Sequence, residues 1–511
     1  MLTGDMLRRS AQRFPDKPAI IRDAQRLSYR ELDRAANRFA NALRATGLAK
    51  GAKVAILSRN LPEYGIVFFG AARSGLVLTN ISILYAPDEL EFVLNKADAE
   101  LLVFDAMFAD KIDAVRPRCT RIRRYIAIGA AAGGESFEAF LAGGAETPPA
   151  VVLDERDPFC MTYTGGTTGR PKGVLCDHRA RAITAHTVAM EEALDERDVV
   201  AIVTPLFHVA ALNIMFQPAV LVGATSTFVT PWSAEKFIET CARDKVSAAF
   251  MVPTQANMLI SHPQFDAAKL ATWRKLSFAG APMPDWVQLE LKKRLPQLAL
   301  TQIYGQSEMG VLTSLRDWCL PAKLGSVGRQ AYNVEVALFA PDGRRAAPGE
   351  LGEIGARGDN LMREYYNEPE QTAAFFKHGD GWGLTGDVGT VDAEGFITLV
   401  DRAKDMLISG GENVYPKEIE DVIYQLEAVS ECAVFGVPDA KFGELPAAYI
   451  ALKPDLRLSE AEVVEHCRTR LAEFKRPRLV KFVSDFPKTP IGKIQKNLLK
   501  EPYWQGQAKK L

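Results

Sequence analysis

The residues best suited to chemistry lie in a loop rich in glycine and threonine, which reads Tyr163-Thr-Gly-Gly-Thr-Thr-Gly-Arg-Pro-Lys-Gly173. Glycines let a backbone approach an anion closely, and the threonine hydroxyls and the ammonium of Lys172 supply donors. The loop is therefore suited to holding phosphate. It lacks the G-x-x-x-x-G-K-[ST] spacing, which disfavours a P-loop kinase or ATPase. Taken alone, a glycine-rich turn with a chance lysine is the alternative interpretation.

Three further segments carry charged side chains that could serve a nucleotide. Tyr304-Gly-Gln-Ser-Glu308 ends on a carboxylate, the kind of oxygen ligand that a hard cation bridging phosphates requires. Trp382-Gly-Leu-Thr-Gly-Asp387 offers a second carboxylate, and Pro487-Lys-Thr-Pro-Ile-Gly-Lys493 places a lysine near the C-terminus. Each has a plainer alternative on its own: a solvated loop carboxylate, a turn residue and a solubilising surface lysine.

The order of these motifs resembles that of the adenylate-forming superfamily of acyl-CoA synthetases, luciferases and peptide-synthetase adenylation domains, over nearly the whole chain. The most distinctive match is Asp401-Arg-Ala-Lys-Asp-Met-Leu-Ile-Ser-Gly-Gly-Glu-Asn-Val-Tyr-Pro-Lys-Glu-Ile-Glu420, which resembles the hinge and first strand-turn of the superfamily's small domain. The resemblance implies an enzyme that uses ATP and magnesium to turn a carboxylic acid into an acyl-adenylate, and then passes the acyl group to coenzyme A. The implied ATP- and AMP-binding residues are Thr164, Gly165, Gly166, Thr167, Thr168, Gly169, Lys172, Gly280, Ala281, Pro282, Tyr304, Gly305, Ser307, Asp387, Arg402 and Lys493.

Roles for single residues in the nucleotide site follow from the same resemblance. Tyr304 is expected to stack on adenine, Ser307 to meet the α-phosphate and Glu308 to hold magnesium. Asp387 and Arg402 are expected to bind the ribose, since one carboxylate can accept both hydroxyl protons.

The resemblance also implies a lysine that moves during the reaction. Lys493 is expected to enter the active site for adenylation, where a fixed cation offsets charge on the acid and the phosphates. Rotation about a hinge at Lys404 would then withdraw it for thioester formation. The expected catalytic residues are Lys172, His208, Glu308 and Lys493.

The acid is expected to bind near Pro205-Leu-Phe-His-Val-Ala-Ala-Leu-Asn213. Amino-acid-activating relatives carry an aspartate near this position, whereas this segment has no anion. His208 resembles the aromatic or histidine gate of acyl- and aryl-CoA ligases, with a satisfied buried histidine as the alternative. The predicted pocket for a fatty or aryl acid consists of His208, Val209, Ala210, Ala211 and Gln306.

Two departures from the superfamily's pattern concern the ATP loop and the pocket. Gly165 stands where these loops commonly carry serine, which removes a hydroxyl but no charge. Gln306 precedes the Ser-Glu pair and is expected to face the acyl pocket.

Coenzyme A is the expected acceptor, because no carrier-protein serine motif follows the small domain. Gly410 and Gly411 are expected to let the pantetheine arm pass close to the backbone. Lys475 and Arg476 are expected to meet the phosphates of coenzyme A, with a solvated basic turn as the alternative. Two other functions stay open: a stand-alone enzyme that charges a carrier protein, and a non-catalytic nucleotide-binding relative. The intact motif residues argue against the second.

The elements that must position these residues alternate between short apolar runs and longer segments of helical period, such as 29–43. The alternation predicts an α/β fold in which helices cover mostly parallel sheets. Frequent glycines and short alternating strands predict a β-rich subdomain at about 325–400. The runs expected to form strands include Val54–Ser58, Leu101–Phe104, Val199–Val203, Ala248–Val252, Glu335–Phe339, Gly352–Ala356 and Phe396–Val400.

A chain of 511 residues is long enough for two or more cores, since a domain commonly holds about 100–200 residues. We predict an N-terminal ATP- and acid-binding domain over 1–401 and a small mobile α+β domain over 402–511, with the hinge at about 402–405. The elements expected in the small domain are strands at Cys432–Val437, Ala448–Lys453 and Leu479–Val483 and a helix at Ser459–Leu471.

Composition indicates small-molecule partners inside the cell. The 62 basic and 63 acidic side chains nearly balance, so no global charge favours nucleic acid. Seven cysteines without a C-x-x-C pair fit neither a disulfide framework nor a zinc site, which favours the reducing cytoplasm. We expect no signal peptide and no transmembrane segment, because polar residues, proline and glycine interrupt the most apolar stretch, Ala210–Val229. A homodimer is compatible with these features.

Overall fold

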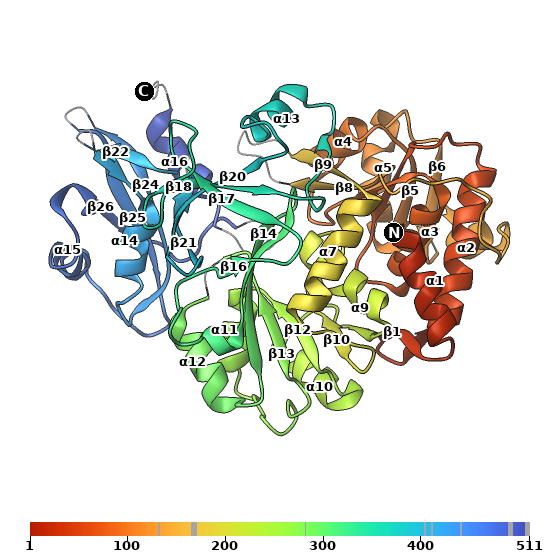
Figure 1. Cartoon of the computed structure of the whole chain (residues 1–511), viewed down its shortest axis with the longest axis horizontal. Coiled ribbons are helices and arrows are strands. Elements are labelled where there is room, and N and C mark those ends of the chain that lie inside the picture. Colours follow the sequence, from red (N-terminus) through yellow and green to blue (C-terminus); the bar gives the residue numbers. More distant parts are fainter. Residues whose placement is uncertain are drawn as a thin grey trace. The chain divides into compact units, whose positions relative to one another are not determined.

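The computed structural model describes residues 1–130, 133–164, 171–281, 283–402, 405–409, 412–439, 442–488 and 494–505, without the side chains of residues 401, 402, 408, 412 and 413. The chain divides into two compact units (Figure 1). The first comprises Met1–Glu335 and Ala356–Gly383, and the second Val336–Gly355 and Leu384–Leu511. The domain boundary near residue 401 stays a prediction, because compactness groups segments by their contacts and does not locate a hinge.

The first unit contains a nine-stranded sheet in the order β16-β15-β14-β13-β12-β10-β11-β1-β2. Its central strands run parallel, and β2, β15 and β16 pair antiparallel at the two edges. The strands are β1 (Pro18–Arg22), β2 (Gln25–Ser28), β10 (Val199–Ile202), β11 (Thr225–Phe228), β12 (Ala248–Met251), β13 (Lys275–Phe278), β14 (Ala299–Gln306), β15 (Gly310–Leu315) and β16 (Arg329–Gln330). The parallel arrangement predicted from the sequence is confirmed, and it places the carboxyl ends of β10, β13 and β14 at one edge.

A second sheet in this unit has eight strands in the order β19-β9-β8-β4-β3-β5-β6-β7. The run from β8 to β7 is parallel, whereas β9 forms an antiparallel hairpin with β8, and β19 adds antiparallel to β9. The strands are β3 (Lys53–Leu57), β4 (Val77–Asn80), β5 (Ala99–Asp105), β6 (Arg124–Ile128), β7 (Glu135–Ser136), β8 (Pro158–Thr164), β9 (Lys172–Asp177) and β19 (Glu364–Tyr365).

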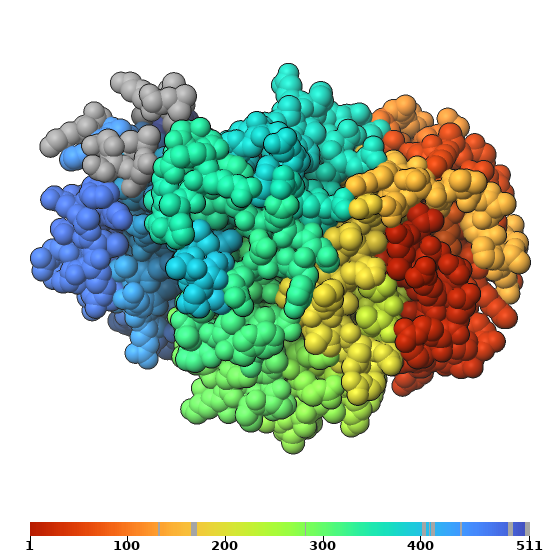
Figure 2. Space-filling model, in the orientation of Figure 1, coloured from red at the N-terminus to blue at the C-terminus, as the bar shows by residue number. Residues whose placement is uncertain are grey.

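Helices cover these sheets, as the alternating pattern predicted. The helix expected at 29–43 forms as α2 (Tyr29–Ala45), because Ser28 and Glu31 build a capping box and Leu32, Phe39 and Leu43 are buried along one face. The first helix, α1, packs on α7 and α9, which come much later in the chain, and Figure 2 shows the red N-terminal segment beside the yellow and yellow-green segments. The other helices of the unit are α1 (Thr3–Arg13), α3 (Pro62–Ser74), α4 (Pro87–Lys96), α5 (Ala109–Val115), α6 (Phe137–Ala142), α7 (His178–Glu191), α8 (Val209–Ala211), α9 (Gln217–Val222), α10 (Ala234–Asp244), α11 (Pro253–Ile260), α12 (Asp285–Arg294) and α13 (Pro369–Phe375).

The apolar stretch 210–229 forms buried helix and strand, as predicted. It runs through α8, a π-helical segment at Leu212–Phe216, α9 and β11, and most of its side chains are buried. Among the described residues, no helix has both the length and the apolar content that crossing a membrane would require.

The second unit is built on two smaller sheets. One has the order β17-β18-β20-β21, and the other has the order β23-β22-β25-β24 with β26 parallel to β25. Buried Leu407, Ile419, Val434 and Ile450 contribute to its core. The elements are β17 (Glu335–Phe339), β18 (Gly352–Arg357), β20 (Gly383–Val391), β21 (Ile397–Arg402), β22 (Leu407–Ser409), β23 (Glu412–Val414), α14 (Pro416–Ile423), β24 (Val429–Asp439), β25 (Gly443–Leu452), α15 (Glu460–Arg468), β26 (Leu479–Phe482) and α16 (Lys496–Trp504).

A buried carboxylate lies at the end of α7, beneath the nine-stranded sheet. Glu192 is only 5% exposed, and within the described residues its Oε1 has no hydrogen-bond partner. Burial raises the pKa of Glu192 to about 8, and the neighbouring Glu191 carboxylate adds to this rise, while Arg316 opposes it. The folded state therefore holds a proton that the unfolded chain releases near pH 4.5.

We predict that Glu192→Gln makes the stability of the first unit less dependent on pH. A raised folded-state pKa stabilises the fold fully below about pH 4.5, and this contribution is lost as the pH rises toward about 8. The loss has a slope on the order of 1.4 kcal/mol per pH unit. Melting curves at pH 6 and pH 8 should show a smaller difference for this variant than for the unmodified protein. Exposed Glu239→Gln is the control, and equal pH dependence in all three proteins would contradict the prediction.

Candidate active site

The predicted phosphate loop is carried by the hairpin of β8 and β9. Thr164 is the last residue of β8 and lies directly opposite Lys172, the first residue of β9. Gly173 packs where a Cβ atom would lie 2.9 Å from the sulfur of Met161 and 3.0 Å from the ring of Tyr163, so a side chain there would require these two neighbours to shift. The predicted ligands between these ends lie outside the described residues: Gly165, Gly166, Thr167, Thr168 and Gly169.

The carboxyl edge of the nine-stranded sheet gathers the other predicted residues of the first unit. Gly280 follows β13 with a φ of 91°, which favours glycine, and Ala281 comes next. Tyr304 lies near the end of the adjacent strand β14, and His208 follows β10. Ligands of open α/β sheets bind outside the carboxyl ends of the strands. Pro282 lies outside the described residues.

Gly305 allows the turn after β14 to form. The register shifts between Tyr304 and Gly305, and a Cβ atom on Gly305 would lie 1.9 Å from the carbonyl oxygen of Gly310 on β15. The backbones therefore approach more closely than any side chain permits. The tight turn that follows carries Ser307 and Glu308, both half-buried.

Tyr365 brings the predicted magnesium ligand and the predicted phosphate lysine to one place. Its hydroxyl donates to Oε1 of Glu308 over 2.9 Å, and the ammonium nitrogen of Lys172 lies 5.2 Å from the centroid of its ring. Burial, with a further contribution from the Glu308 carboxylate, raises the pKa of Tyr365, so the hydroxyl stays a donor. The sequence reasoning missed this residue, because two adjacent tyrosines before an Asn-Glu-Pro turn carry no distinctive signal.

The donor set fits a magnesium ion that arrives with phosphates. Among the described residues no group of three or more His, Cys, Asp or Glu side chains could hold a metal ion. Magnesium at nucleotide sites commonly takes one or two carboxylates, with phosphates and water as its other ligands. Within that same part of the chain, the second carboxylate oxygen of Glu308 accepts no hydrogen bond, so it could serve as the protein ligand.

The predicted acid-binding residues lie at the ends of β10 and β14, at the same edge of the sheet. His208 caps α8, and its Nδ1 accepts a hydrogen bond from the backbone amide of Ala210 over 3.2 Å. His208, Ala210 and Gln306 are half-buried, whereas Val209 and Ala211 are buried. The π-helical turns that follow are a feature often found at functional sites.

The second unit carries the remaining predicted residues. Asp387 is buried and lies directly opposite Arg402 in the antiparallel ladder of β20 and β21, so the predicted ribose pair is adjacent in the backbone. Lys475 forms an ion pair with Glu418, and Nε of Arg476 donates to the carbonyl of Leu471 over 3.0 Å. The predicted residues outside the described part of the chain are Lys404, Gly410, Gly411 and Lys493.

Comparison with known proteins agrees with this arrangement. Residues 7–366 match the family described as AMP-binding enzyme, and residues 418–493 match the AMP-binding enzyme C-terminal domain. The chain belongs to the adenylate-forming acyl-CoA synthetase family. The resemblance inferred from the motifs is thereby confirmed.

Known acyl-CoA synthetases align with this chain over nearly its full length. The long-chain-fatty-acid–CoA ligase FadD13 of Mycobacterium tuberculosis is 36% identical over 509 residues, which cover 98% of each chain. The feruloyl-CoA synthase of an Amycolatopsis species is 35% identical, with 96% of each chain covered. The anthranilate CoA ligase AuaEII, solved in complex with anthranoyl-AMP, superimposes with a TM-score of 0.90 at 28% identity, covering 98% of this chain and 97% of its own.

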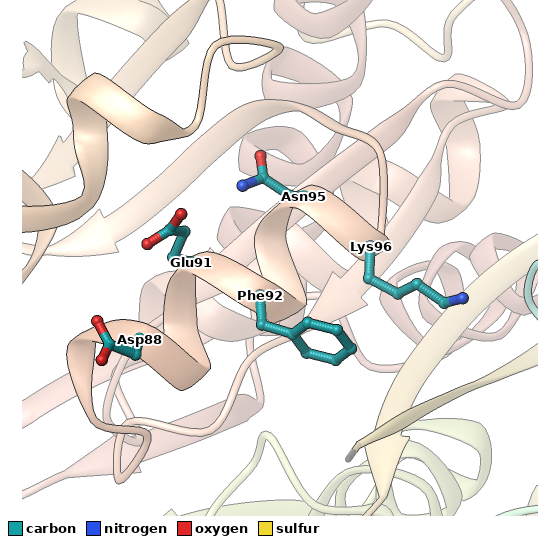
Figure 3. A pocket seen from close by; sticks show the side chains of 5 residues that line it. All are labelled: Asp88, Glu91, Phe92, Asn95 and Lys96. Atoms are coloured by element: carbon teal, nitrogen blue, oxygen red, sulfur yellow. The ribbon is translucent and has the colours of Figure 1, made fainter.

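A surface hollow on α4 is lined by none of the predicted residues. It has a volume of about 400 Å³ and is lined by Asp88, Glu91, Phe92, Asn95 and Lys96 (Figure 3). Glu91 pairs with Arg118, and Lys96 pairs with Glu368. Its charges are already neutralised by neighbours, so we do not assign substrate binding to it.

We predict that Gly305→Ala disrupts the site from within the sheet. The added carbon would force β14 and β15 apart, which should destabilise the first unit by roughly 1–3 kcal/mol and displace Glu308. The affinity for ATP, measured by titration calorimetry, should fall together with the melting temperature. Gly143→Ala is the matched control, because its Cβ atom would lie 3.6 Å from its nearest neighbour, an ordinary contact. Equal ATP affinity in the two variants would refute the prediction.

Proposed function

We propose that this enzyme is an ATP-dependent acid–CoA ligase that activates a hydrophobic monocarboxylic acid. The acid would form an acyl-adenylate with release of pyrophosphate, and coenzyme A would then take the acyl group. The observation that supports this most directly is that Lys172 and Glu308 both contact Tyr365, beside the hairpin that carries the phosphate loop. Relatives named for fatty and aryl acids support the choice of acid.

The residues of the first unit would serve the adenylation step. The carboxylate oxygen of the acid attacks the α-phosphorus of ATP, and the pyrophosphate leaves with its electron pair. Lys172 and the loop donors would hold the leaving phosphates, while Ser307 would meet the α-phosphate and Tyr304 would stack on adenine. Glu308 would hold magnesium, which when bound offsets the negative charge of the phosphates.

The second step transfers the acyl group to a thiol. The sulfur of coenzyme A attacks the carbonyl carbon of the mixed anhydride, and AMP leaves. We place Lys493 at the first step and the backbone of Gly410 and Gly411 at the second, with a rotation about Lys404 between them. Lys475 and Arg476 would meet the phosphates of coenzyme A only after exchanging their present partners, Glu418 and the carbonyl of Leu471.

The acid pocket would suit an apolar tail. His208, Ala210 and Gln306 are the half-buried members of the predicted set, and none carries a negative charge that could pair with a substrate ammonium. We assign a fatty or aryl acid on this ground. The seven cysteines, all of them among the described residues, form no disulfide, which supports the cytoplasm as the compartment in which the enzyme acts.

Measuring pyrophosphate release for a panel of acids tests the proposed function. Short, medium and long fatty acids, benzoates, cinnamates, dicarboxylates and amino acids would each be incubated with ATP and magnesium, with and without coenzyme A. At least one hydrophobic monocarboxylic acid should give both pyrophosphate and an acyl-CoA thioester. Adenylates that coenzyme A does not consume would support the carrier-protein alternative, and turnover confined to amino acids or dicarboxylates would refute the assignment of the acid.

We predict that Lys493→Ala separates the two half-reactions. Removing the cation should slow acyl-adenylate formation by about 100-fold or more, while thioester formation from purified adenylate stays largely intact. Exposed Lys481→Ala controls for loss of charge in the same unit. Single-turnover pyrophosphate release and thioester yield measure the two steps, and equal losses in both would remove Lys493 from its role.

A further inference from the structure

Residues 362–366 connect the two large sheets of the first unit at the candidate site. The backbone amide of Met362 donates to the carbonyl of Glu308 over 2.6 Å, and the amide of Tyr366 donates to the carbonyl of Gly173 over 2.8 Å. Between these two anchors, Tyr365 pairs with Val174 of β9. The segment therefore fixes the turn after β14 against the hairpin of the phosphate loop.

The ring of Tyr365 is held independently of its hydroxyl. The backbone amide of Tyr365 donates to Oγ1 of Thr372 over 3.0 Å, and the ring of Tyr365 packs edge-on against the ring of Phe375 with 5.9 Å between centroids. Strand pairing, ring packing and the backbone contact leave the hydroxyl little freedom. That hydroxyl has one described partner, Oε1 of Glu308.

The two carboxylate oxygens of Glu308 have different surroundings. Oε1 accepts from Tyr365, and across the described residues Oε2 accepts no hydrogen bond. A carboxylate that binds a metal is commonly oriented in this way by a hydrogen bond to its other oxygen. The ammonium nitrogen of Lys172 lies 5.2 Å from the centroid of the same ring, and within the described residues Lys172 forms no ion pair with a carboxylate.

We infer that Tyr365 is a positioning residue, which orients the Glu308 carboxylate for magnesium and keeps it from pairing with Lys172 before ATP binds. The inference rests on the proposed function for its assignment of Glu308 and Lys172. The hydroxyl performs the first task and the ring performs the second. A lysine paired with Glu308 would be withdrawn from the phosphates, and the carboxylate would be withdrawn from the metal.

Two substitutions separate these tasks. Tyr365→Phe removes the hydroxyl and keeps the ring, so it should raise the magnesium concentration needed for half-maximal ATP binding by about tenfold. Saturating magnesium should restore binding. Tyr365→Leu also removes the ring, so it should additionally weaken ATP binding measured without magnesium. Tyr366→Phe is the matched control, because its hydroxyl donates to Asp98 over 2.8 Å, away from the predicted ligands.

A double-mutant cycle distinguishes positioning from a merely structural role. If the hydroxyl acts through the carboxylate, Tyr365→Phe should have no further effect on the magnesium requirement in a Glu308→Gln background. The readout is ATP binding by the full-length protein without acid or coenzyme A. Calorimetry or thermal shift measures this binding over a series of magnesium concentrations. Melting curves without nucleotide confirm that each variant is folded. Pyrophosphate release with an accepted acid then shows whether KM for magnesium changes while kcat does not.

Several outcomes would overturn the inference. These are an unchanged magnesium requirement in Tyr365→Phe, an effect that persists undiminished in the Glu308→Gln background, and wild-type ATP binding that does not respond to magnesium. Should Tyr365→Phe fail to fold, Tyr365→Leu provides the test, because it also lacks the hydroxyl, leaves Glu308 intact and should raise the magnesium requirement similarly. If magnesium-dependent ATP binding behaves as predicted but no acid gives a thioester, the proposed function fails and the role of Tyr365 stands.

Discussion

The antiparallel pairing of β19 with β9 is the contact on which the candidate site of this enzyme depends. It joins a strand from residues 364–365 to the hairpin that carries the phosphate loop, and the amide of Met362, just before it, binds the carbonyl of Glu308. These contacts thereby hold the two sheets of the first unit, which come from different parts of the chain, in a fixed position at the site. A carboxylate for a metal and a cation for phosphate need such fixed spacing, since electrostatic stabilisation depends on groups that are already in place.

Glycines make the second constraint, because they allow backbones to approach where the site requires it. A Cβ atom at Gly305 would overlap the carbonyl oxygen of Gly310, and one at Gly173 would press on the ring of Tyr163. Gly305 precedes the turn that carries Glu308, and Gly173 is the second residue of the strand that begins at Lys172. Packing within the sheets therefore fixes the main chain that carries the functional side chains. A substitution that contacts no substrate can still displace a side chain such as that of Glu308.

The two units divide the predicted work. The first contains Lys172, Glu308 and His208, which serve the phosphates, the metal and the acid in the proposed reaction. The second contains Asp387 and Arg402, which the ladder of β20 and β21 sets side by side. In the proposed reaction a carboxylate and then a thiol act as nucleophiles, and a domain motion between the two steps would change the groups around the reacting atoms.

The sequence by itself determined the family, the α/β class and the order of the motifs, because glycine, threonine and charged residues at fixed spacing are local signals. It also located the helix predicted at 29–43 and most of the strands that it predicted to within a few residues, since burial on one face leaves a periodic pattern. The predicted ribose pair followed from motifs, but only the register of β20 and β21 placed its two members opposite each other. The role of Tyr365 at the site was decided by the tertiary structure alone. Its partners Glu308 and Lys172 lie in distant parts of the chain, and a hydrogen bond between remote segments leaves no periodic trace in the sequence.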